Sequence, residues 1–274
     1  MTERKTNLHM PNFVHETAIV DPQATLGKNI KIGPYCVVGP HVVIGDNTEL
    51  QSHVVIQGHT VIGEDNKIFP FASIGQIPQD LKYNGEQTSL IIGNRNVIRE
   101  SVTMSIGTVG GGGKTILGDD NLLMGLVHLG HDSIVGNKCV LAQGATLAGH
   151  VEVEDNVVIG GMSAVHQFVR IGQHAMIGGM TPVIRDVLPY TTAAGGRGAI
   201  SSLNLIGLRR RGFSRASISV LRQAFDYVIE THEGTFESRM SKMLAEHPES
   251  VELKIWHDFS VKSKRGISTR VQGE

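Results

Sequence analysis

Aliphatic side chains recur at every sixth position along most of the chain. One run covers residues 26–74, a second covers 92–104, and a third, shifted by one residue, covers 117–183. A spacing of six fits neither the 3.6-residue period of a helix nor the two-residue alternation of a strand. It is typical of hexapeptide repeats, three of which form one triangular coil of about 18 residues. The pattern predicts a mainly β protein, a parallel β-helix whose aliphatic residues point inward and stack from coil to coil.

Small and polar residues also keep a fixed place in the repeat. Glycine often follows the inward aliphatic residue, and asparagine recurs near the next corner, at Asn29, Asn47, Asn66 and Asn121. Both residue types adopt positive φ at low cost. We therefore expect them to turn the corners of the coils.

Two segments interrupt the repeat. "GQIPQDLKYNGEQTSLI", residues 75–91, keeps the register but places Gln79, Asp80 and Glu86 around positions where aliphatic residues belong. "SIGTVGGGGKTI", residues 105–116, adds one residue and a run of glycines. We expect a projecting loop at the first and a flexible loop at the second, because loops on a rigid solenoid are where function is usually added.

The repeat ends near residue 190. Ser214 is a candidate N-cap for a helix, and the segments that start at Thr235 and Val251 are expected to form two more helices. The predicted organisation is a flexible N-terminus (1–12), a β-helix (13–190) with its two loops, and a C-terminal α-helical domain (191–274).

Composition and charge narrow the function. The formal net charge is −1 and the sequence pI is about 6.9, so there is no basic field of the kind that drives binding to nucleic acid. No run of about 18 apolar residues is present, so we expect no stable membrane insertion. The first residues lack a signal-peptide pattern, and the two distant cysteines, Cys36 and Cys139, fit free thiols in a reducing compartment. We therefore expect a cytoplasmic protein.

Three short motifs are candidates for chemistry. "TVGGGGKT" approaches a phosphate-binding P-loop, but Thr108 stands where that motif needs glycine, and the repeat rather than a helix follows. In "VHLGHDSIVG" the residues His128 and His131, with His150, could bind zinc. Alternatively, Asp132 could orient His131 as a general base. "GLRRRGFSR" is either a solvated run of charge or a phosphate-binding segment.

Longer motifs carry a resemblance to one family. "NLLMGLVHLGHDSIVGNKCVLAQGATLAGHVEVEDNVVIGGMSAVHQF", with "IGQIPQDLKYNGE" before it and "GLRRRGFSR" after it, resembles the UDP-N-acetylglucosamine O-acyltransferases that open lipid A biosynthesis. The resemblance runs from about residue 14 to about residue 266. It implies a left-handed β-helix and a homotrimer with active sites between neighbouring prisms. It also implies transfer of an (R)-3-hydroxyacyl group from acyl carrier protein to the glucosamine 3-position of a UDP sugar, with no cofactor and no metal.

The same resemblance implies roles for individual residues. His131 matches the family's general base, a task that suits an imidazole because histidine titrates near neutral pH. Asp132 would orient the base, and the Gly149 backbone N–H matches the oxyanion donor. Sugar and acyl-substrate contacts correspond to Asp80, Lys82, His128, His150 and Gln167, with His166 beside the last of them. Nucleotide-side contacts and a basic surface for acyl carrier protein correspond to Asn204, Arg210 and Arg211, and Gly179 matches a glycine of the acyl-chain groove.

Several positions depart from the family pattern. Arg197 and Ile206 replace an expected His and Glu near Asn204, and Ser105 with Ile106 replaces an expected polar pair. These changes leave open an alternative acceptor, the 3-amino analogue of the UDP sugar. They also leave open a non-catalytic paralogue that binds acyl carrier protein or a UDP sugar. A zinc-dependent hydratase on the same fold is a third alternative.

Overall fold

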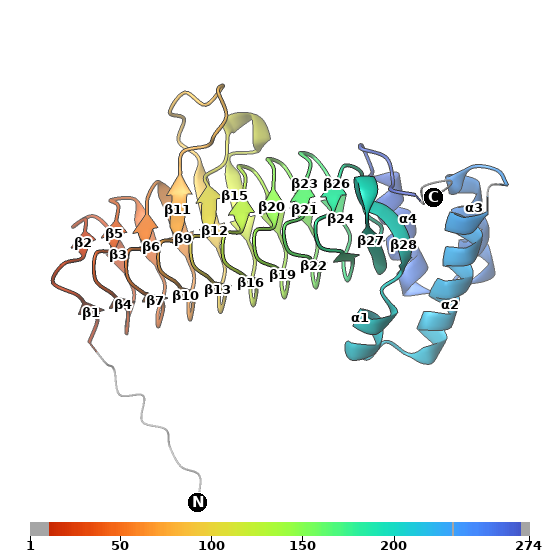
Figure 1. The fold of residues 1–274 in the computed structure, drawn as a ribbon, viewed down its shortest axis with the longest axis horizontal. Coiled ribbons are helices and arrows are strands. Elements are labelled where there is room, and N and C mark those ends of the chain that lie inside the picture. The colour runs from red at the N-terminus through yellow and green to blue at the C-terminus, as the bar shows by residue number, and fades with distance from the viewer. Residues whose placement is uncertain (1–10, 232, 270–274) are drawn as a thin grey trace, which may run out of the picture.

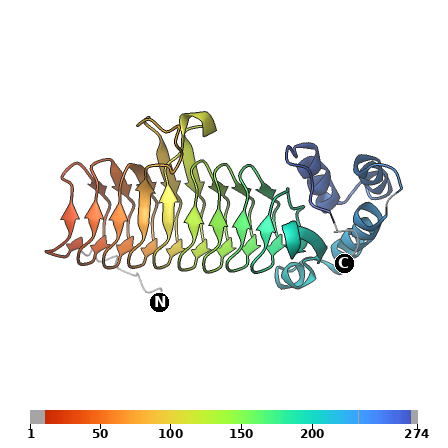
Figure 2. The same cartoon turned by 45° about the horizontal axis from the view of Figure 1, so that its top comes forward.

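The structure, a computed structural model, describes residues 11–231 and 233–269. The N-terminus that we expected to be flexible, 1–12, therefore lies outside the described residues except for its last two. The described chain forms a long left-handed parallel β-helix with helices at its C-terminal end, and two loops project from one side near the middle (Figure 1). Seen from a second direction, the same two loops stand away from the stacked coils (Figure 2).

Short strands on the three sides of the prism form three sheets. Sheet A contains β1 (Phe13–Val14), β4 (Lys31–Ile32), β7 (Glu49–Leu50), β10 (Lys67–Ile68), β13 (Val97–Ile98), β16 (Leu122–Leu123), β19 (Val140–Leu141), β22 (Val158–Ile159), β25 (Met176–Ile177), β27 (Thr191–Ala194) and β28 (Ala199–Leu203). Sheet B contains β2 (Ile19–Val20), β5 (Val37–Val38), β8 (Val55–Ile56), β11 (Ser73–Gln76), β14 (Thr103–Ser105), β17 (His128–Leu129), β20 (Thr146–Leu147), β23 (Ala164–Val165) and β26 (Pro182–Val183). Sheet C contains β3 (Thr25–Leu26), β6 (Val42–Ile44), β9 (His59–Ile62), β12 (Ser89–Ile92), β15 (Lys114–Leu117), β18 (Ile134–Val135), β21 (Glu152–Val153) and β24 (Arg170–Ile171).

Pairing between neighbouring coils gives the lengths of both loops. Most strands pair in parallel with the strand eighteen residues later, as Lys31 does with Glu49. His59 instead pairs with Ser89, and Ser89 pairs with Lys114. The first loop, residues 77–88, therefore adds twelve residues to one turn, and the second loop, which lies within residues 106–113, adds seven. Twelve is a multiple of six and seven is not, which explains why only the second loop shifts the sequence repeat by one residue.

The core of the prism is formed by the predicted inward positions and by a second position two residues before each of them. The aliphatic residues of the six-residue repeat are buried, except that Leu26 of the first coils is only partly buried. Most second positions carry smaller or polar residues, and both free cysteines, Cys36 and Cys139, occupy such positions. Each coil thus contributes two inward side chains per face, which is why so narrow a prism excludes water.

The asparagines divide into two groups, and our expectation for one group was wrong. Asn29 and Asn47 do turn a corner with positive φ. Asn66 and Asn121 do not: they occupy the second inward position, where they are buried with Asn96 in a ladder. The Asn96 side chain accepts a hydrogen bond from the Asn121 backbone N–H (2.9 Å) and donates to the Gly118 carbonyl (2.9 Å). The ladder satisfies backbone groups that the corner would otherwise leave unpaired.

The glycines that follow the inward residues are required for a reason other than the one we expected. Gly33 and Gly45 do not have positive φ. A Cβ atom on Gly45 would lie 2.7 Å from the backbone of Gly63 in the next coil, and one on Gly33 would lie 2.7 Å from the Gln51 carbonyl oxygen. These positions exclude a side chain because adjacent coils approach too closely, since parallel strands lie only about 4.8 Å apart.

The C-terminal region begins with structure that the sequence pattern did not predict. Strand β27 pairs in parallel with β25 beyond residue 190, and β28 returns antiparallel to β27. The helical elements are α1 (Leu205–Arg210), α2 (Arg215–Phe225), a π-helical turn η3 (Asp226–Glu230), α3 (Phe236–Glu246) and α4 (Val251–Val261). Ser214, Thr235 and Ser250 cap α2, α3 and α4 through their side-chain oxygens.

The helices that the structure describes are too short or too polar to span a lipid bilayer.

An aromatic cluster joins this region to the last coils of the prism. The His174 ring stacks on Tyr190 (5.7 Å between centroids) and meets the Phe213 ring edge-on at 5.1 Å. Burial and, to a smaller extent, the nearby Arg211 guanidinium lower the pKa of His174 to about 4, while Asp155 acts in the opposite direction. The imidazole is therefore neutral in the folded protein at neutral pH.

We expect Asn96→Ala to lower the free energy of unfolding by about 2–4 kcal/mol, because it leaves the Asn121 N–H and the Gly118 carbonyl without partners inside the prism. Urea denaturation measures the change. The matched control is Asn84→Ala, which removes an exposed side chain from the first loop. Equal stability of the two variants would contradict the role of the ladder.

We expect stability to fall as the pH drops from 6.5 to 4, because in that window the unfolded chain binds a proton at residue 174 that the folded chain does not. His174→Phe keeps an aromatic ring and should flatten this part of the pH dependence, measured by thermal melting across the range. Phenylalanine already occupies equivalent positive-φ corner positions at Phe71 and Phe168. His257→Phe, at a partly exposed position of α4, should retain the wild-type slope.

Candidate active site

The three corners of the prism carry different residues. The corner between sheets C and A is polar, with Asn47, Asp65 and Asp120 at positive φ. The corner between sheets A and B carries exposed apolar side chains; we call it the apolar corner, defined by Tyr35, Phe71, Leu126, Met162 and Met180. The corner between sheets B and C carries the predicted base and both loops; we call it the site corner, defined by residues 131–132, 149–150 and 166–168 in three successive coils.

At the site corner, the ring of His131 contacts the carboxylate of Asp132. The His131 Nδ1 and the Asp132 Oδ2 lie 2.8 Å apart. Because a carboxylate is an acceptor, the ring proton lies on Nδ1, and Nε2 keeps a free lone pair. The Asp132 side chain is completely buried, whereas 17 % of the His131 side chain is exposed. The pair therefore presents a basic nitrogen toward solvent and keeps its charge partner away from it.

The second loop holds the carboxylate from the other side. The Thr108 backbone N–H donates to both Asp132 oxygens (2.9 and 3.0 Å), and the Thr108 hydroxyl donates to Oδ2 at 2.6 Å. Gly111 lies over the carboxylate so closely that a Cβ atom there would be 2.1 Å from the Asp132 Cγ. The loop that we expected to be flexible is thus anchored to the next coil at two points, through the buried Thr108 and through Gly111.

Gly149 and His150 form the next level of the site corner. A Cβ atom at Gly149 would lie 2.7 Å from the His131 Nε2, so only glycine fits beside the base. Among the described residues, the Gly149 N–H has no hydrogen-bond acceptor. His150 meets the His131 ring edge-on at 5.0 Å and stacks on Phe168 at 4.4 Å. Phe168 therefore fixes the orientation of His150, a contact that sequence reasoning missed.

Two neighbouring histidines are held neutral. Burial lowers the pKa of His128, as does the nearby His131, and the His128 Nδ1 lies 2.7 Å from the Thr103 hydroxyl. Burial also lowers the pKa of His150, although the Asp132 carboxylate acts against the shift. Uncharged imidazoles can donate or accept hydrogen bonds with a neutral sugar hydroxyl.

Three side chains of this cluster are of types that bind metals. Ligand atoms of His131, Asp132 and His150 lie within 4.8 Å of one another. Both Asp132 oxygens, however, already accept hydrogen bonds from Thr108, and Oδ2 also contacts His131. The donor set fits a metal poorly because its carboxylate is used within the protein, and His128 stands outside the group.

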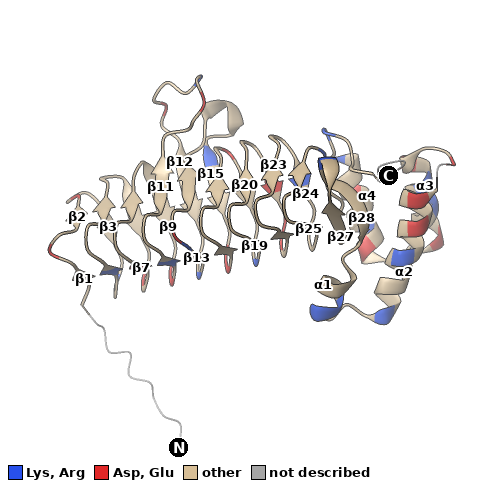
Figure 3. Cartoon of the chain, in the orientation of Figure 1, with Lys and Arg blue, Asp and Glu red and all other residues tan. Residues whose placement is uncertain are grey.

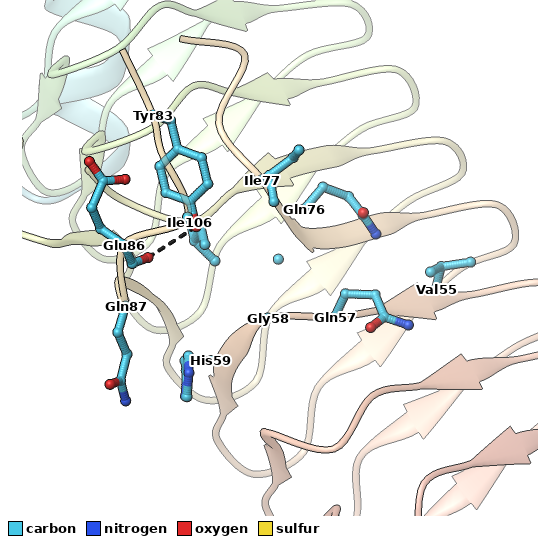
Figure 4. Close-up of a pocket in the computed structure, with 12 residues that line it drawn as sticks. Val55, Gln57, Gly58, His59, Gln76, Ile77, Tyr83, Glu86, Gln87 and Ile106 are labelled. Atoms are coloured by element: carbon cyan, nitrogen blue, oxygen red, sulfur yellow. Dashed lines mark hydrogen bonds between the residues drawn. The ribbon is translucent and has the colours of Figure 1, made fainter. Parts of the chain in front are cut away.

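The first loop forms a cleft with the coils on its N-terminal side (Figure 4). The cleft has a volume of about 690 Å³, and its walls include His59 from β9, Gln76 from β11 and Tyr83 from the loop. The Tyr83 hydroxyl donates to the Glu86 carbonyl oxygen at 3.0 Å and closes the loop on itself. Ile106, which replaces an expected polar residue, is buried and lines this cleft.

The remaining predicted residues lie in several places. Asp80 and Lys82, in the first loop, are close enough to influence the charge on His150. His166 and Gln167 are exposed at the site corner, one coil after Gly149. Gly179 lies elsewhere, on the apolar corner beside Met180.

Asn204, Arg210 and Arg211 lie in or next to α1, on the C-terminal side of the prism. Asn204 caps α1 by accepting from the Gly207 N–H and donates to the His174 carbonyl at 2.9 Å. Arg211 donates to the side chain and carbonyl of Asn156, while Arg210 is exposed. Basic residues gather on α1 and at the start of α2 (Figure 3). Beside them is a cleft of about 560 Å³ lined by residues that include Arg209, Arg215 and Arg222.

Comparisons with known proteins agree with this architecture. The family model described as UDP-N-acetylglucosamine O-acyltransferase, domain 2, matches residues 186–268, and the bacterial transferase hexapeptide model matches 13–45 and 23–58. The acyl-[acyl-carrier-protein]–UDP-N-acetylglucosamine O-acyltransferase of Aliarcobacter butzleri is 50% identical over 93% of this chain and 98% of its own. That of Burkholderia orbicola is 57% identical over 77% of this chain and 81% of its own.

Solved structures give the same result. LpxA from Acinetobacter baumannii is 42% identical, with a TM-score of 0.91 over 93% of this chain and 99% of that one. The UDP-N-acetylglucosamine acyltransferase from Campylobacter jejuni is 36% identical, with a TM-score of 0.89 over 94% of this chain and 100% of that one. With these identities maintained across both the prism and the helical end, the chain belongs to the UDP-N-acetylglucosamine O-acyltransferase family.

Proposed function

We propose that the protein transfers an (R)-3-hydroxyacyl group from acyl carrier protein to the 3-hydroxyl of UDP-N-acetylglucosamine, the first step of lipid A biosynthesis. The observation that carries the proposal is the contact between His131 and the buried Asp132, beside the unpaired N–H of Gly149. The names of the relatives specify an oxygen acceptor, which favours the hydroxyl over the 3-amino analogue.

The proton is transferred at the His131 Nε2. With Nδ1–H directed at Asp132, Nε2 accepts the proton of the sugar hydroxyl while the oxygen attacks the thioester carbonyl carbon. The buried carboxylate stabilises the imidazolium that results. As the C–S bond breaks, the imidazolium returns its proton to the sulfur of the leaving thiol. The acyl group passes directly between substrates, so the residues at this corner need no covalent intermediate.

The negative charge that forms on the carbonyl oxygen needs a donor near the base. The Gly149 N–H suits this role because the described protein offers it no acceptor and because a Cβ atom on Gly149 would lie 2.7 Å from the His131 Nε2, which places this backbone beside the base. A backbone donor fixed by the coil requires no reorganisation during the reaction. His128, His150 and Gln167, with Asp80 and Lys82 from the first loop, would then contact the sugar and the acyl substrate.

The distribution of the other predicted residues supports a homotrimer. Gly179 is on the apolar corner and the base is on the site corner, so one chain cannot place both on one substrate. The apolar corner exposes 60% of Phe71, 68% of Met162 and 81% of Met180. Such a line of large apolar side chains is costly in water and suits contact with another copy. Packing the apolar corner of one chain near the site corner of the next would place Gly179 and the base along the same cleft between subunits.

The arginines at the C-terminal end suit the acyl donor. Acyl carrier protein is acidic, and Arg209, Arg210 and Arg215 offer exposed positive charge on α1 and α2. Electrostatic attraction of this kind mainly raises the rate of association and weakens with salt. Asn204 and Arg211, which already hold α1 against the coils, would contact the nucleotide side.

Replacing the base tests the activity directly. We expect His131→Ala to lower kcat by about 10²–10⁴-fold, the usual contribution of general base catalysis, at unchanged folding. The assay offers UDP-N-acetylglucosamine and its 3-amino analogue with acyl carrier proteins that carry several chain lengths. His257→Ala, far from the site on α4, is the control. Retained turnover in His131→Ala would overturn the assignment of the base, and acylation of the amino sugar alone would overturn the acceptor.

Reversing one surface charge tests the docking of the carrier. We expect Arg210→Glu to raise the KM for acyl carrier protein by about tenfold at low salt, with kcat and the KM for the UDP sugar nearly unchanged. The difference from wild type should shrink as salt is added. Lys262→Glu, after the end of α4, provides a matched reversal of charge. A KM that did not respond to Arg210→Glu would exclude this surface as the docking site.

A further inference from the structure

We propose that Thr108 is a positioning residue for the reaction: with Gly111, it fixes the Asp132 carboxylate so that the carboxylate serves His131 and not His150. The inference rests on the proposed function, since it concerns the same base. It assigns a task to the glycine-rich loop, whose sequence had suggested only a flexible loop.

The Asp132 carboxylate accepts an unusual number of hydrogen bonds. Asp132 accepts from the Thr108 N–H at both oxygens, from the Thr108 hydroxyl at 2.6 Å, and from His131 at 2.8 Å. Its own backbone N–H donates to the Thr115 hydroxyl at 2.8 Å. A buried carboxylate is costly unless its lone pairs are satisfied, and Thr108 supplies most of the donors.

Two imidazoles, those of His131 and His150, compete for one oxygen of the Asp132 carboxylate. The same oxygen, Asp132 Oδ2, lies 2.8 Å from the His131 Nδ1 and 4.0 Å from the His150 Nδ1. A rotation of the carboxylate could therefore exchange one partner for the other. The Thr108 hydroxyl binds to that very oxygen, while the Thr108 N–H bridges the two oxygens. Together, these hydrogen bonds from Thr108 allow one orientation of the carboxylate, in which it contacts His131.

The second loop packs against the Asp132 carboxylate at Gly111 and not at Gly110. A Cβ atom on Gly111 would lie 2.1 Å from the Asp132 Cγ, whereas one on Gly110 would meet nothing within 4 Å. Only at Gly111 is the absence of a side chain needed for the loop to cover the carboxylate. Gly110 thus has room for a side chain and Gly111 has none, so the two adjacent glycines form a matched pair for experiment.

The hydroxyl is tested by Thr108→Val and Thr108→Ser. We expect Thr108→Val to lower kcat by about 10–100-fold, the loss of one hydrogen bond to a charged group, with both KM values nearly unchanged. Thr108→Ser keeps the hydroxyl and should restore most of the activity. Thr108→Val with wild-type kcat would overturn the proposal, and so would a Thr108→Ser variant as impaired as Thr108→Val.

The pH profile separates positioning from a merely structural role. Without the hydroxyl, the carboxylate can turn away from His131 toward His150 and stabilises the His131 imidazolium less, so the acidic limb of kcat/KM should move to lower pH in Thr108→Val. Charged and titratable groups that also face this site are His128 and His150, together with Asp80 and Lys82 of the first loop. They are unchanged in the variant. Lower activity with an unmoved limb would indicate a structural role alone and would overturn the proposal.

The glycine pair and a second readout complete the test. Gly111→Ala should lose activity as Thr108→Val does, while Gly110→Ala should retain it; equal effects would overturn the role of Gly111. The imidazole titration of His131, followed by nitrogen NMR in wild type and Thr108→Val, needs no turnover. A shifted titration in a protein that acylates neither sugar would overturn the proposed function and leave the positioning role standing. An unshifted titration would overturn the positioning role, whatever the activity.

Discussion

The hydrogen bonds between successive coils are the constraint on which the rest of the molecule depends. The backbone N–H of one coil donates to the carbonyl of the next, as Gly33 does to Leu50 and Gly63 does to Ile92. This bonding holds neighbouring coils at about 4.8 Å along the whole prism. It excludes side chains where backbones approach most closely, and it brings residues one coil apart in the sequence into direct contact. A line of side chains along a corner is therefore encoded by single residues spaced a full coil apart, which lets each corner acquire its own chemistry.

Both loops leave the prism at the site corner without disturbing this bonding. The strands on either side of each insertion keep their partners, so β9, β12 and β15 pair in register although twelve and then seven residues intervene. An insertion at a corner costs little because no strand bond is lost, and loop closure depends only weakly on length. The consequence is that a loop from one coil covers the corner of the next. Thr108 reaches Asp132 in this way.

The fold and the catalytic pair were predictable for different reasons. The inward aliphatic residues repeat at a fixed interval, so burial of positions such as Ile44 and Leu141 follows from spacing alone. His131 and Asp132 are adjacent in the chain, and their contact needs no knowledge of the loops. The contact of Thr108 with Asp132 spans twenty-four residues and depends on the length of an insertion, so the sequence pattern could not register it. Asn66 was misplaced because corner and inward positions differ by a single residue, and asparagine suits both.

Two histidines occupy the site corner in adjacent coils, yet their backbones place them differently. His150 itself has positive φ, whereas in the preceding coil it is Asp132 that has positive φ, and His131 stands one residue before it. The two rings consequently meet at a right angle, with His150 held by its stack on Phe168 and His131 directed at the carboxylate. A ring stacked on a neighbour in this way has a fixed orientation and, with a lowered pKa, no charge, which suits contact with a ligand. A ring paired with a buried carboxylate can gain a proton at little electrostatic cost. The difference of one residue in corner register thus separates a binding histidine from a base. The hydrogen bonds from Thr108 to the carboxylate preserve that distinction.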